Sequence, residues 1–187
     1  MKKFIFFILI VTGIVYLLRE EYQTKQYSDS YLDKKISVDV KDQVVYISGL
    51  GDFNQSDLET ASKKITEVYG LKCEIIEPTP TYKELYTSDN KLNVITCSQL
   101  LNHTNKTVYI TNEYIFRDKI VCGSSISSGN FVIVSNNFND LKNTTIHEMA
   151  HTFGLGHCDN QCILGHIELG DPNGKFCNDC KLKLGLK

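Results

Sequence analysis

The sequence has no large excess of charge of either sign. Its 187 residues include 20 Lys and Arg against 22 Asp and Glu, which gives a net charge of −2. Three of the positive charges, Lys2, Lys3 and Arg19, lie near the N-terminus, so the rest of the chain is more acidic than the whole. Nucleic-acid-binding domains usually carry a basic surface. The charge balance therefore gives no reason to expect a nucleic-acid partner, and we predict none.

Tryptophan, internal repeats and low-complexity tracts are also missing. Of all residues, 42% are hydrophobic and 22% are charged, which is ordinary for a globular protein. The length suffices for one domain and one additional segment. We therefore expect a single globular domain, and a monomer.

A long uncharged run occupies the N-terminus. Residues 4–18 contain no charged side chain and are followed by Arg19-Glu20-Glu21. A helix of this length would measure about 22 Å, which is short for a bilayer crossing and typical of a signal-peptide core. No small-residue cleavage site and no lipobox cysteine follow it. We predict that residues 1–19 form an uncleaved signal-anchor or a cleaved signal peptide; the alternative is a buried helix of a soluble protein.

The charges around this run predict its orientation. Lys2 and Lys3 precede it, and positively charged residues tend to stay on the cytoplasmic side. The expected protein is therefore membrane-anchored through its N-terminal helix with an extracytoplasmic domain, or secreted. Residues 20–35 are polar and predict a stalk without a fold of its own. Residues 36–187 remain for the folded domain.

Short strands and helices alternate through the middle of the chain. Runs of β-branched and apolar residues predict strands at 36–40, 44–47, 72–76, 108–111, 120–123 and 131–135. Helical spacing and capping residues predict helices at 56–69, 92–101 (capped by Asp89) and 139–153. This order predicts a mixed α/β or α+β fold, in which 120–123 and 131–135 form an antiparallel pair at one edge of the sheet.

The most informative stretch lies on and just after the last predicted helix. It contains three histidines, an acid and a glycine at fixed offsets: His147, Glu148, His151, Gly154 and His157. His147 and His151 are one helical turn apart, so both imidazoles can bind one Zn²⁺. Gly154 permits a sharp turn that would bring His157 to the same ion.

Three histidine ligands leave one zinc position for water, which is the arrangement of catalytic sites. Glu148 lies beside the ligands without being one, where a general base for that water should be. The predicted chemistry is peptide-bond hydrolysis. Two alternatives stay open: ordinary histidines on an amphipathic helix, and a third ligand from a later acid such as Glu168. His103 and His166 match no ligand spacing and are expected at the surface.

Four cysteines crowd into the segment that follows: Cys158, Cys162, Cys177 and Cys180. Two close pairs of thiolates separated by a loop are typical of a structural zinc site. Two disulfides are the alternative, because an extracytoplasmic location permits them. The remaining cysteines, Cys73, Cys97 and Cys122, have no metal-ligand spacing and are expected to be buried thiols, of which one pair could be oxidised.

Together these residues resemble a known family. His-Glu-x-x-His-x-x-Gly-x-x-His, followed at once by a cysteine, then a second cysteine and a closing Cys-x-x-Cys, is similar to the archaemetzincins, a branch of the metzincin zinc peptidases. The resemblance implies two Zn²⁺ ions per chain. The first would be catalytic, on His147, His151 and His157 with Glu148 as base; the second would be structural, on the four cysteines.

The same resemblance implies a fold. It is the metzincin fold, with a twisted mixed sheet, an active-site helix and a small zinc-stapled C-terminal subdomain from about residue 155. The edge strand within 120–125 would pair with the backbone of a peptide or protein substrate. The chain departs from the family in three ways: tighter cysteine spacing, Leu164 in place of a methionine under the metal, and no tyrosine after Tyr114.

The predicted function is therefore that of a zinc metallopeptidase. The alternative is a catalytically silent, zinc-stabilised binding or scaffold domain tethered to a membrane, which the intact Glu148 disfavours. A zinc-ribbon nucleic-acid binder built on the four cysteines is the weakest hypothesis, because the chain is acidic and expected to be exported.

Overall fold

The computed structural model describes residues 43–101, 104–165 and 174–186. The chain divides into two units, Met1–Lys35 and Ile36–Lys187, and every described residue lies in the second. The apolar helix and the polar stalk predicted for the N-terminus lie outside the described residues. Within the described ranges, no helix is both long enough and apolar enough to cross a membrane.

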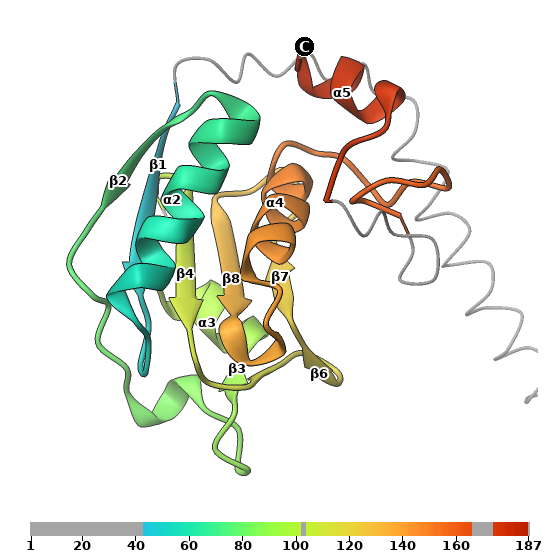
Figure 1. Ribbon diagram of the computed structural model, residues 1–187. Coiled ribbons are helices and arrows are strands. Elements are labelled where there is room, and N and C mark those ends of the chain that lie inside the picture. The colour runs from blue at the N-terminus through green and yellow to red at the C-terminus, as the bar shows by residue number, and fades with distance from the viewer. Residues whose placement is uncertain (1–42, 102–103, 166–173, 187) are drawn as a thin grey trace, which may run out of the picture. The chain divides into compact units, whose positions relative to one another are not determined.

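Five strands form the main sheet, in the order β2-β1-β4-β8-β7 (Figure 1). Their bounds are β1 Val44–Gly49, β2 Lys72–Ile75, β4 Thr107–Thr111, β7 Gly123–Ser125 and β8 Phe131–Ser135. Neighbouring strands are parallel except β7, which runs antiparallel to β8 at the edge. All residues of β4 and β8 are buried, as expected of strands covered on both faces. The predicted mixed α/β sheet with one antiparallel edge is confirmed.

A second, smaller sheet has the order β3-β5-β6, with β3 at Leu92–Asn93, β5 at Ile115–Phe116 and β6 at Ile120–Val121. The predicted pairing of the whole segment 120–123 with 131–135 is therefore wrong. Ile120 and Val121 pair with β5 in a hairpin closed by a three-residue connection, a turn that forms locally. Only the residues from Gly123 onward pair with β8.

The second predicted helix starts later than expected and has a different cap. Helix α3 spans Val94–Leu100, because Leu92 and Asn93 belong to β3. The Asn93 side chain accepts a hydrogen bond from the Thr96 N–H at 3.1 Å, so Asn93 rather than Asp89 caps the helix.

Helices α2 (Gln55–Tyr69) and α4 (Leu141–Thr152) cover one face of the main sheet (Figure 1). Helix α2 ends at Gly70, in a left-handed conformation with φ of 68°, as predicted. Helix α4 begins two residues later than predicted, because Asn139 is also left-handed and closes the short 3₁₀ turn η3 at Asn136–Phe138. The remaining elements are η2, at Lys83–Leu85, and α5, at Asn178–Leu184.

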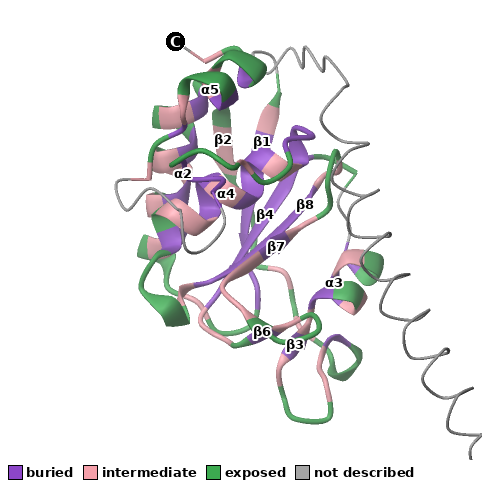
Figure 2. Ribbon diagram, turned by 90° about the vertical axis from the view of Figure 1, so that its right-hand side faces the viewer, coloured by how far each residue is buried: buried purple, intermediate pink, exposed green. Residues whose placement is uncertain are grey.

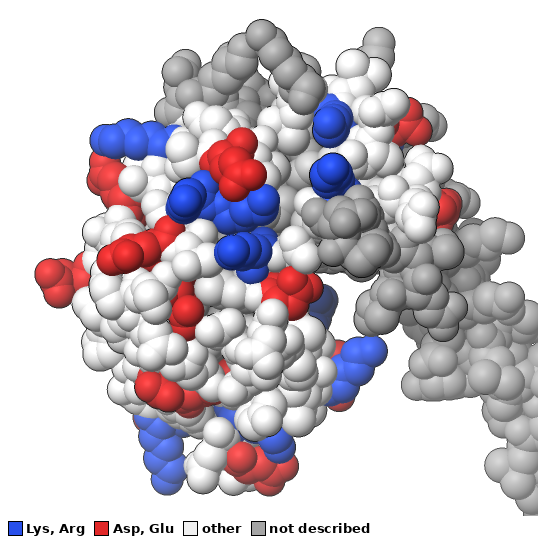
Figure 3. Space-filling model, viewed as in Figure 1, with Lys and Arg blue, Asp and Glu red and all other residues white. Residues whose placement is uncertain are grey.

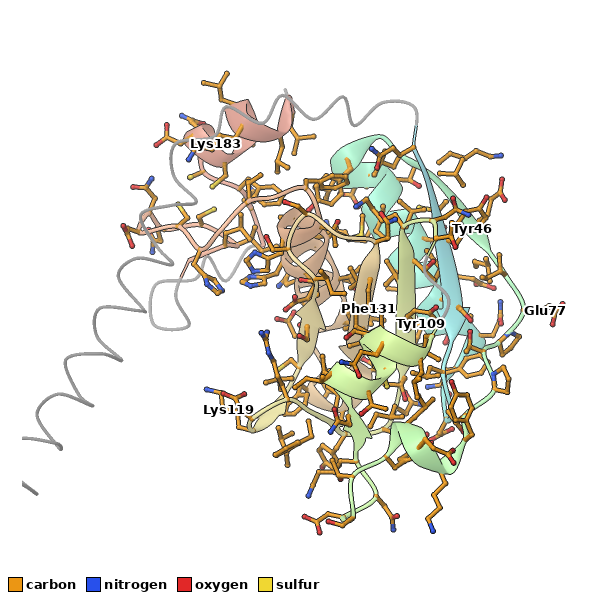
Figure 4. All side chains as sticks on the ribbon, turned by 180° about the vertical axis from the view of Figure 1, so that it is seen from behind. Tyr46, Glu77, Tyr109, Lys119, Phe131 and Lys183 are labelled. Carbon is orange, nitrogen blue, oxygen red and sulfur yellow. The ribbon has the colours of Figure 1, made fainter. Side chains whose placement is uncertain are left out.

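Each face of the sheet has its own apolar core. Val108 and Ile110 of β4 belong to the core under α2 and α4, whereas Tyr109 between them belongs to the core on the opposite face, as strand alternation requires. In that second core Tyr109 lies beside Phe131 with ring centroids 5.7 Å apart (Figure 4). Buried residues concentrate on the central strands, and exposed residues on the outer sides of the helices (Figure 2).

Helix α2 also supports α4 through a polar contact. The buried Tyr69 hydroxyl donates a hydrogen bond to the Ile146 carbonyl of α4 at 2.6 Å. The Tyr69 ring packs against Phe153 at the end of α4 and against Phe176 of the C-terminal segment. Acidic and basic side chains are intermixed on the face that carries α2 (Figure 3). The position of α4, from which the predicted ligands project, is thus fixed by packing on two sides.

Candidate metal centres

Helix α4 carries the first two predicted ligands. His147 and His151 are one helical turn apart, so their side chains project from the same side of the helix. Their Nε2 atoms are 3.0 Å apart. Two nitrogens bound to one tetrahedral Zn²⁺ would be separated by about 3.3 Å. The two imidazoles are therefore already at a distance suited to chelating one ion.

A turn after α4 brings in the third ligand. Gly154 is left-handed with φ of 86°, and its N–H closes the turn on the His151 carbonyl at 2.9 Å. A side chain with a Cβ would be strained there. The chain then reverses, and the His157 ring centroid lies 5.3 Å from that of His147 and 4.9 Å from that of His151. The ligand atoms of all three histidines lie within 4.8 Å of one another.

Backbone carbonyls fix the orientation of the two helical imidazoles. Nδ1 of His147 is 2.7 Å from the Ile163 carbonyl, and Nδ1 of His151 is 2.6 Å from the Leu155 carbonyl. A carbonyl oxygen can only accept, so each Nδ1 carries the proton and each Nε2 presents a lone pair. Two lone pairs this close repel each other unless a cation lies between them. The donor set thus fits a zinc ion, with ligands oriented as metal-binding histidines usually are.

Electrostatics favour the neutral, metal-binding form of His151. Burial lowers the pKa of His151 to about 4, and the nearby His147 and His157 act in the same direction. The hydrogen bond to Leu155 opposes this shift without reversing it. At neutral pH this imidazole is therefore uncharged and able to donate its lone pair to a metal.

Glu148 lies next to this cluster and is almost fully buried, with 9% of its surface exposed. Burial raises the pKa of its carboxyl; the electrostatic effect of His147, a hydrogen bond from Ser125 and the charge of Arg117 oppose that shift. The Ser125 hydroxyl donates to Oε2 of Glu148 at 2.7 Å. A buried carboxylate with a raised pKa is suited to accepting a proton.

Strand β7 passes directly over this glutamate, a contact that sequence reasoning missed. A Cβ placed on Gly123 would lie 2.8 Å from Cγ of Glu148 and 2.6 Å from Cγ2 of Thr144. The segment 120–125 was expected at the sheet edge, yet neither Gly123 nor Ser125 was assigned a role. Their spacing of two in a strand, which puts both on one face, was the available signal.

The four predicted cysteines form a second cluster. Sγ atoms of Cys158, Cys162, Cys177 and Cys180 lie within 4.8 Å of one another. None of them forms a disulfide, so the structure does not contain the alternative pairing. Sγ of Cys158 is 3.7 Å from Sγ of Cys177, and two thiolates on one tetrahedral Zn²⁺ would lie about 3.8 Å apart. The cluster is suited to a structural zinc ion.

Hydrogen bonds around this cluster favour the thiolate form of Cys177. The Asn160 N–H donates to Sγ of Cys158 at 3.4 Å, and the Cys177 N–H donates to Sγ of Cys162 at 3.3 Å. Burial alone would raise the pKa of Cys177, but hydrogen bonds from the Cys180 backbone and from the other thiols lower it to about 7. These donors stabilise negative sulfur at Cys177, the form that binds zinc, whereas burial raises the pKa of Cys158 and of Cys180.

The residues that directly follow Cys162 pack onto the sheet domain. Leu164 is fully buried in the core beneath α4; its place under the metal, in the position of the family's methionine, stays a prediction. The Ile163 N–H donates to the Lys175 carbonyl at 2.7 Å, and the Cys158 N–H donates to the Leu164 carbonyl at 2.9 Å. These bonds fold the loop back toward His157.

Several predicted residues fall elsewhere. His103, His166 and Glu168 lie outside the described residues, so the alternative third ligand is not tested. All three scattered cysteines are free: Cys97 is buried, whereas Cys73 and Cys122 are half-buried. No pair of them is oxidised.

Comparison with family models found no match for the chain. An archaemetzincin of Nanoarchaeum equitans is 40% identical over 48 residues, which are 24% of this chain and 28% of that protein. An archaemetzincin of Sulfolobus acidocaldarius is 45% identical over 51 residues, 25% of this chain and 28% of that protein. Each match thus spans little more than a quarter of the curated relative.

Solved structures match over much more of the chain. The crystal structure of an archaemetzincin from Archaeoglobus fulgidus, complexed with malonate, has a TM-score of 0.66 at 18% identity and covers 75% of this chain and 99% of that one. An archaemetzincin from Methanopyrus kandleri gives 0.63 at 17% identity, with 79% and 96% covered. A zinc-dependent peptidase from Methanocorpusculum labreanum gives 0.58 at 18% identity, with 75% and 99% covered. Both sequence matches and two of the three structures are archaemetzincins, and the resemblance of this chain to the archaemetzincins is confirmed.

Proposed function

We propose that this chain is a zinc metallopeptidase. The observation that carries the proposal is the convergence of three imidazole ligand atoms beside one buried carboxylate, that of Glu148. His147, His151 and His157 would hold the catalytic zinc, and the four clustered cysteines a structural one. When bound, the catalytic zinc supplies Lewis-acid chemistry that polarises a carbonyl group and acidifies water. The likeness to archaemetzincins supports the same conclusion.

Glu148 is the general base in this proposal. Its buried carboxylate takes a proton from water as the water oxygen attacks the carbonyl carbon of the peptide bond. The raised pKa caused by burial favours this uptake. The same carboxyl then gives its proton to the leaving amine, which completes the hydrolysis.

Strand β7 supplies the place for a peptide or protein substrate. Among the described strands it pairs with β8 alone, so its other edge presents backbone donors and acceptors. An extended peptide can pair with such an edge through backbone hydrogen bonds. Gly123 of β7 lies close to Thr144 and Glu148, and Ser125 donates a hydrogen bond to Glu148. A peptide on this edge would therefore lie beside the proposed base.

The test uses the full chain in detergent with zinc and a fluorogenic peptide library. Wild type should cleave some of the peptides, and Glu148→Ala should lower turnover at least about 100-fold while zinc content, measured by mass spectrometry, stays the same. Glu67→Ala, on the exposed side of α2, is the control and should match wild type. Turnover unchanged in Glu148→Ala would refute the proposal; full zinc loading without any cleavage would favour the silent scaffold domain.

We also propose that residues 1–19 act as a signal-anchor or a signal peptide, which carries the domain to a membrane or across it. Residues 20–35 would form a stalk, and residues 36–187 a monomeric peptidase domain. The support is the uncharged run 4–18 and the lysines before it. Membrane fractionation of the expressed chain tests this. Ile8→Lys, which places a charge in the run, should move the protein to the soluble fraction of the cell; an unchanged distribution would contradict the proposal.

A further inference from the structure

The carboxylate of Glu148 is held between helix α4 and strand β7. Gly123 and Ser125 are two residues apart in β7, so their side-chain positions face the helix together. At Gly123 the strand approaches so closely that a Cβ would lie 2.8 Å from Cγ of Glu148. Oε1 of Glu148 lies 3.2 Å from the same Cβ position, whereas Oε2 meets the strand at the next inward position, that of Ser125.

Ser125 makes a specific contact there. Its Oγ donates to Oε2 of Glu148 at 2.7 Å, and the two residues are 23 apart in sequence. Hydrogen bonds to an ionised carboxylate are short and strong. This one distinguishes the two carboxylate oxygens, because Ser125 donates to Oε2 and not to Oε1.

The neighbouring serine shows that a hydroxyl in β7 is not enough. Ser124 points to the opposite face of the strand and is 4% exposed. Its Oγ has no hydrogen-bond partner among the described residues. The two serines differ in the face that they occupy, and only Ser125 reaches the glutamate. Ser124 is therefore a matched control for any substitution of Ser125.

We propose that Ser125 is a positioning residue for Glu148, an inference that rests on the proposed role of Glu148 as general base. The Ser125 hydroxyl holds Oε2 and turns the carboxylate so that Oε1 takes the proton released when the O–H bond of the attacking water breaks. Because β7 is also the strand on which a peptide would pair, the orientation of the base is tied to the strand that carries the substrate.

The experiment compares the full-length wild type with three variants: Ser125→Ala, Ser125→Thr and Ser124→Ala. Turnover is measured on a peptide that the wild type cleaves, and each metal-free protein is also crystallised. Ser125→Ala should lower kcat about 10- to 100-fold with KM within about twofold of wild type, because the base is misplaced while binding is kept. Ser125→Thr retains the hydroxyl and should restore most of kcat. Ser124→Ala should behave as wild type.

The crystal structures supply a readout that does not depend on activity. In Ser125→Ala the carboxylate of Glu148 should be displaced or adopt two conformations, whereas in Ser125→Thr it should stay in place. A Ser125→Ala protein with wild-type kcat and an unmoved carboxylate overturns the inference, and so does a Ser125→Thr protein as impaired as Ser125→Ala. If the wild type cleaves no peptide, the proposed function fails, and the position of Glu148 in the metal-free variants decides the inference alone.

Discussion

Adding one methyl group at Gly123 should displace the carboxylate of Glu148, the proposed base. The Cβ of Gly123→Ala would lie 2.6 Å from Cγ2 of Thr144 and 2.8 Å from Cγ of Glu148. Non-bonded carbons are most stable at about 3.5–4.0 Å, so the strand, the helix or these two side chains must move by roughly 1 Å. Overpacking of this kind costs about 1–3 kcal/mol. For a chain of this size, each kcal/mol lowers Tm by about 2–4 °C.

The functional loss should exceed the loss of stability. A base displaced by roughly 1 Å can cost about 100-fold in rate, so kcat should fall by that order while most of the protein stays folded at assay temperature. Differential scanning fluorimetry with excess zinc gives Tm, and peptide turnover gives kcat. Gly156→Ala is the control: its Cβ meets nothing within 4 Å and its φ is not positive, although it lies between His151 and His157. A Gly123→Ala protein with unchanged Tm and kcat would refute the close approach of β7 to Glu148.

Three further changes test other parts of the structure. Tyr69→Phe removes the hydroxyl that donates to the Ile146 carbonyl at 2.6 Å, and should lower the free energy of unfolding by about 1–2 kcal/mol in urea titrations; no change would mean that α4 does not need this support. Cys180→Ser should lower the zinc content by one ion per chain, as measured by mass spectrometry, and an unchanged content would argue against a four-thiolate site. Burial lowers the pKa of Lys106 to about 8, so the folded protein disfavours its charge. The stability of the wild type should therefore rise relative to that of Lys106→Met as the pH increases from about 8 toward 10. Thermal unfolding curves that shift with pH by the same amount in both proteins would contradict this.

The ligand set was predictable because its geometry is local. The helical period alone puts His147 and His151 on one side of α4, and Gly154 predicts the turn that brings His157 close to them. The four cysteines are likewise grouped by short spacings. The main sheet was predictable because runs of β-branched residues alternate with segments of helical spacing. Two of these runs, 108–111 and 131–135, are buried at every residue.

Features that depend on distant contacts were not predictable. The division of 120–125 into β6 and β7 depends on which strand each half pairs with, and neither Ile-Val nor Gly-Ser-Ser indicates its partner. The cap at Asn93 replaced Asp89 because Leu92 joined a strand with Ile115. The hydrogen bond between Ser125 and Glu148 spans 23 residues; strand alternation separates the faces of Ser125 and Ser124, but nothing local indicates which face meets the glutamate.

The backbone joins the two metal sites at two places. His157 is bonded directly to Cys158, and the Ile163 carbonyl, next to Cys162, accepts the hydrogen bond from His147. An ion at either site therefore restricts backbone that the other site uses, so their binding free energies should be coupled. Such coupling is reciprocal: if zinc on the thiolates tightens the histidine site by some factor, zinc on the histidines tightens the thiolate site by the same factor. Zinc titration of the metal-free chain should accordingly be cooperative, and the affinity of each site should be a property of the pair.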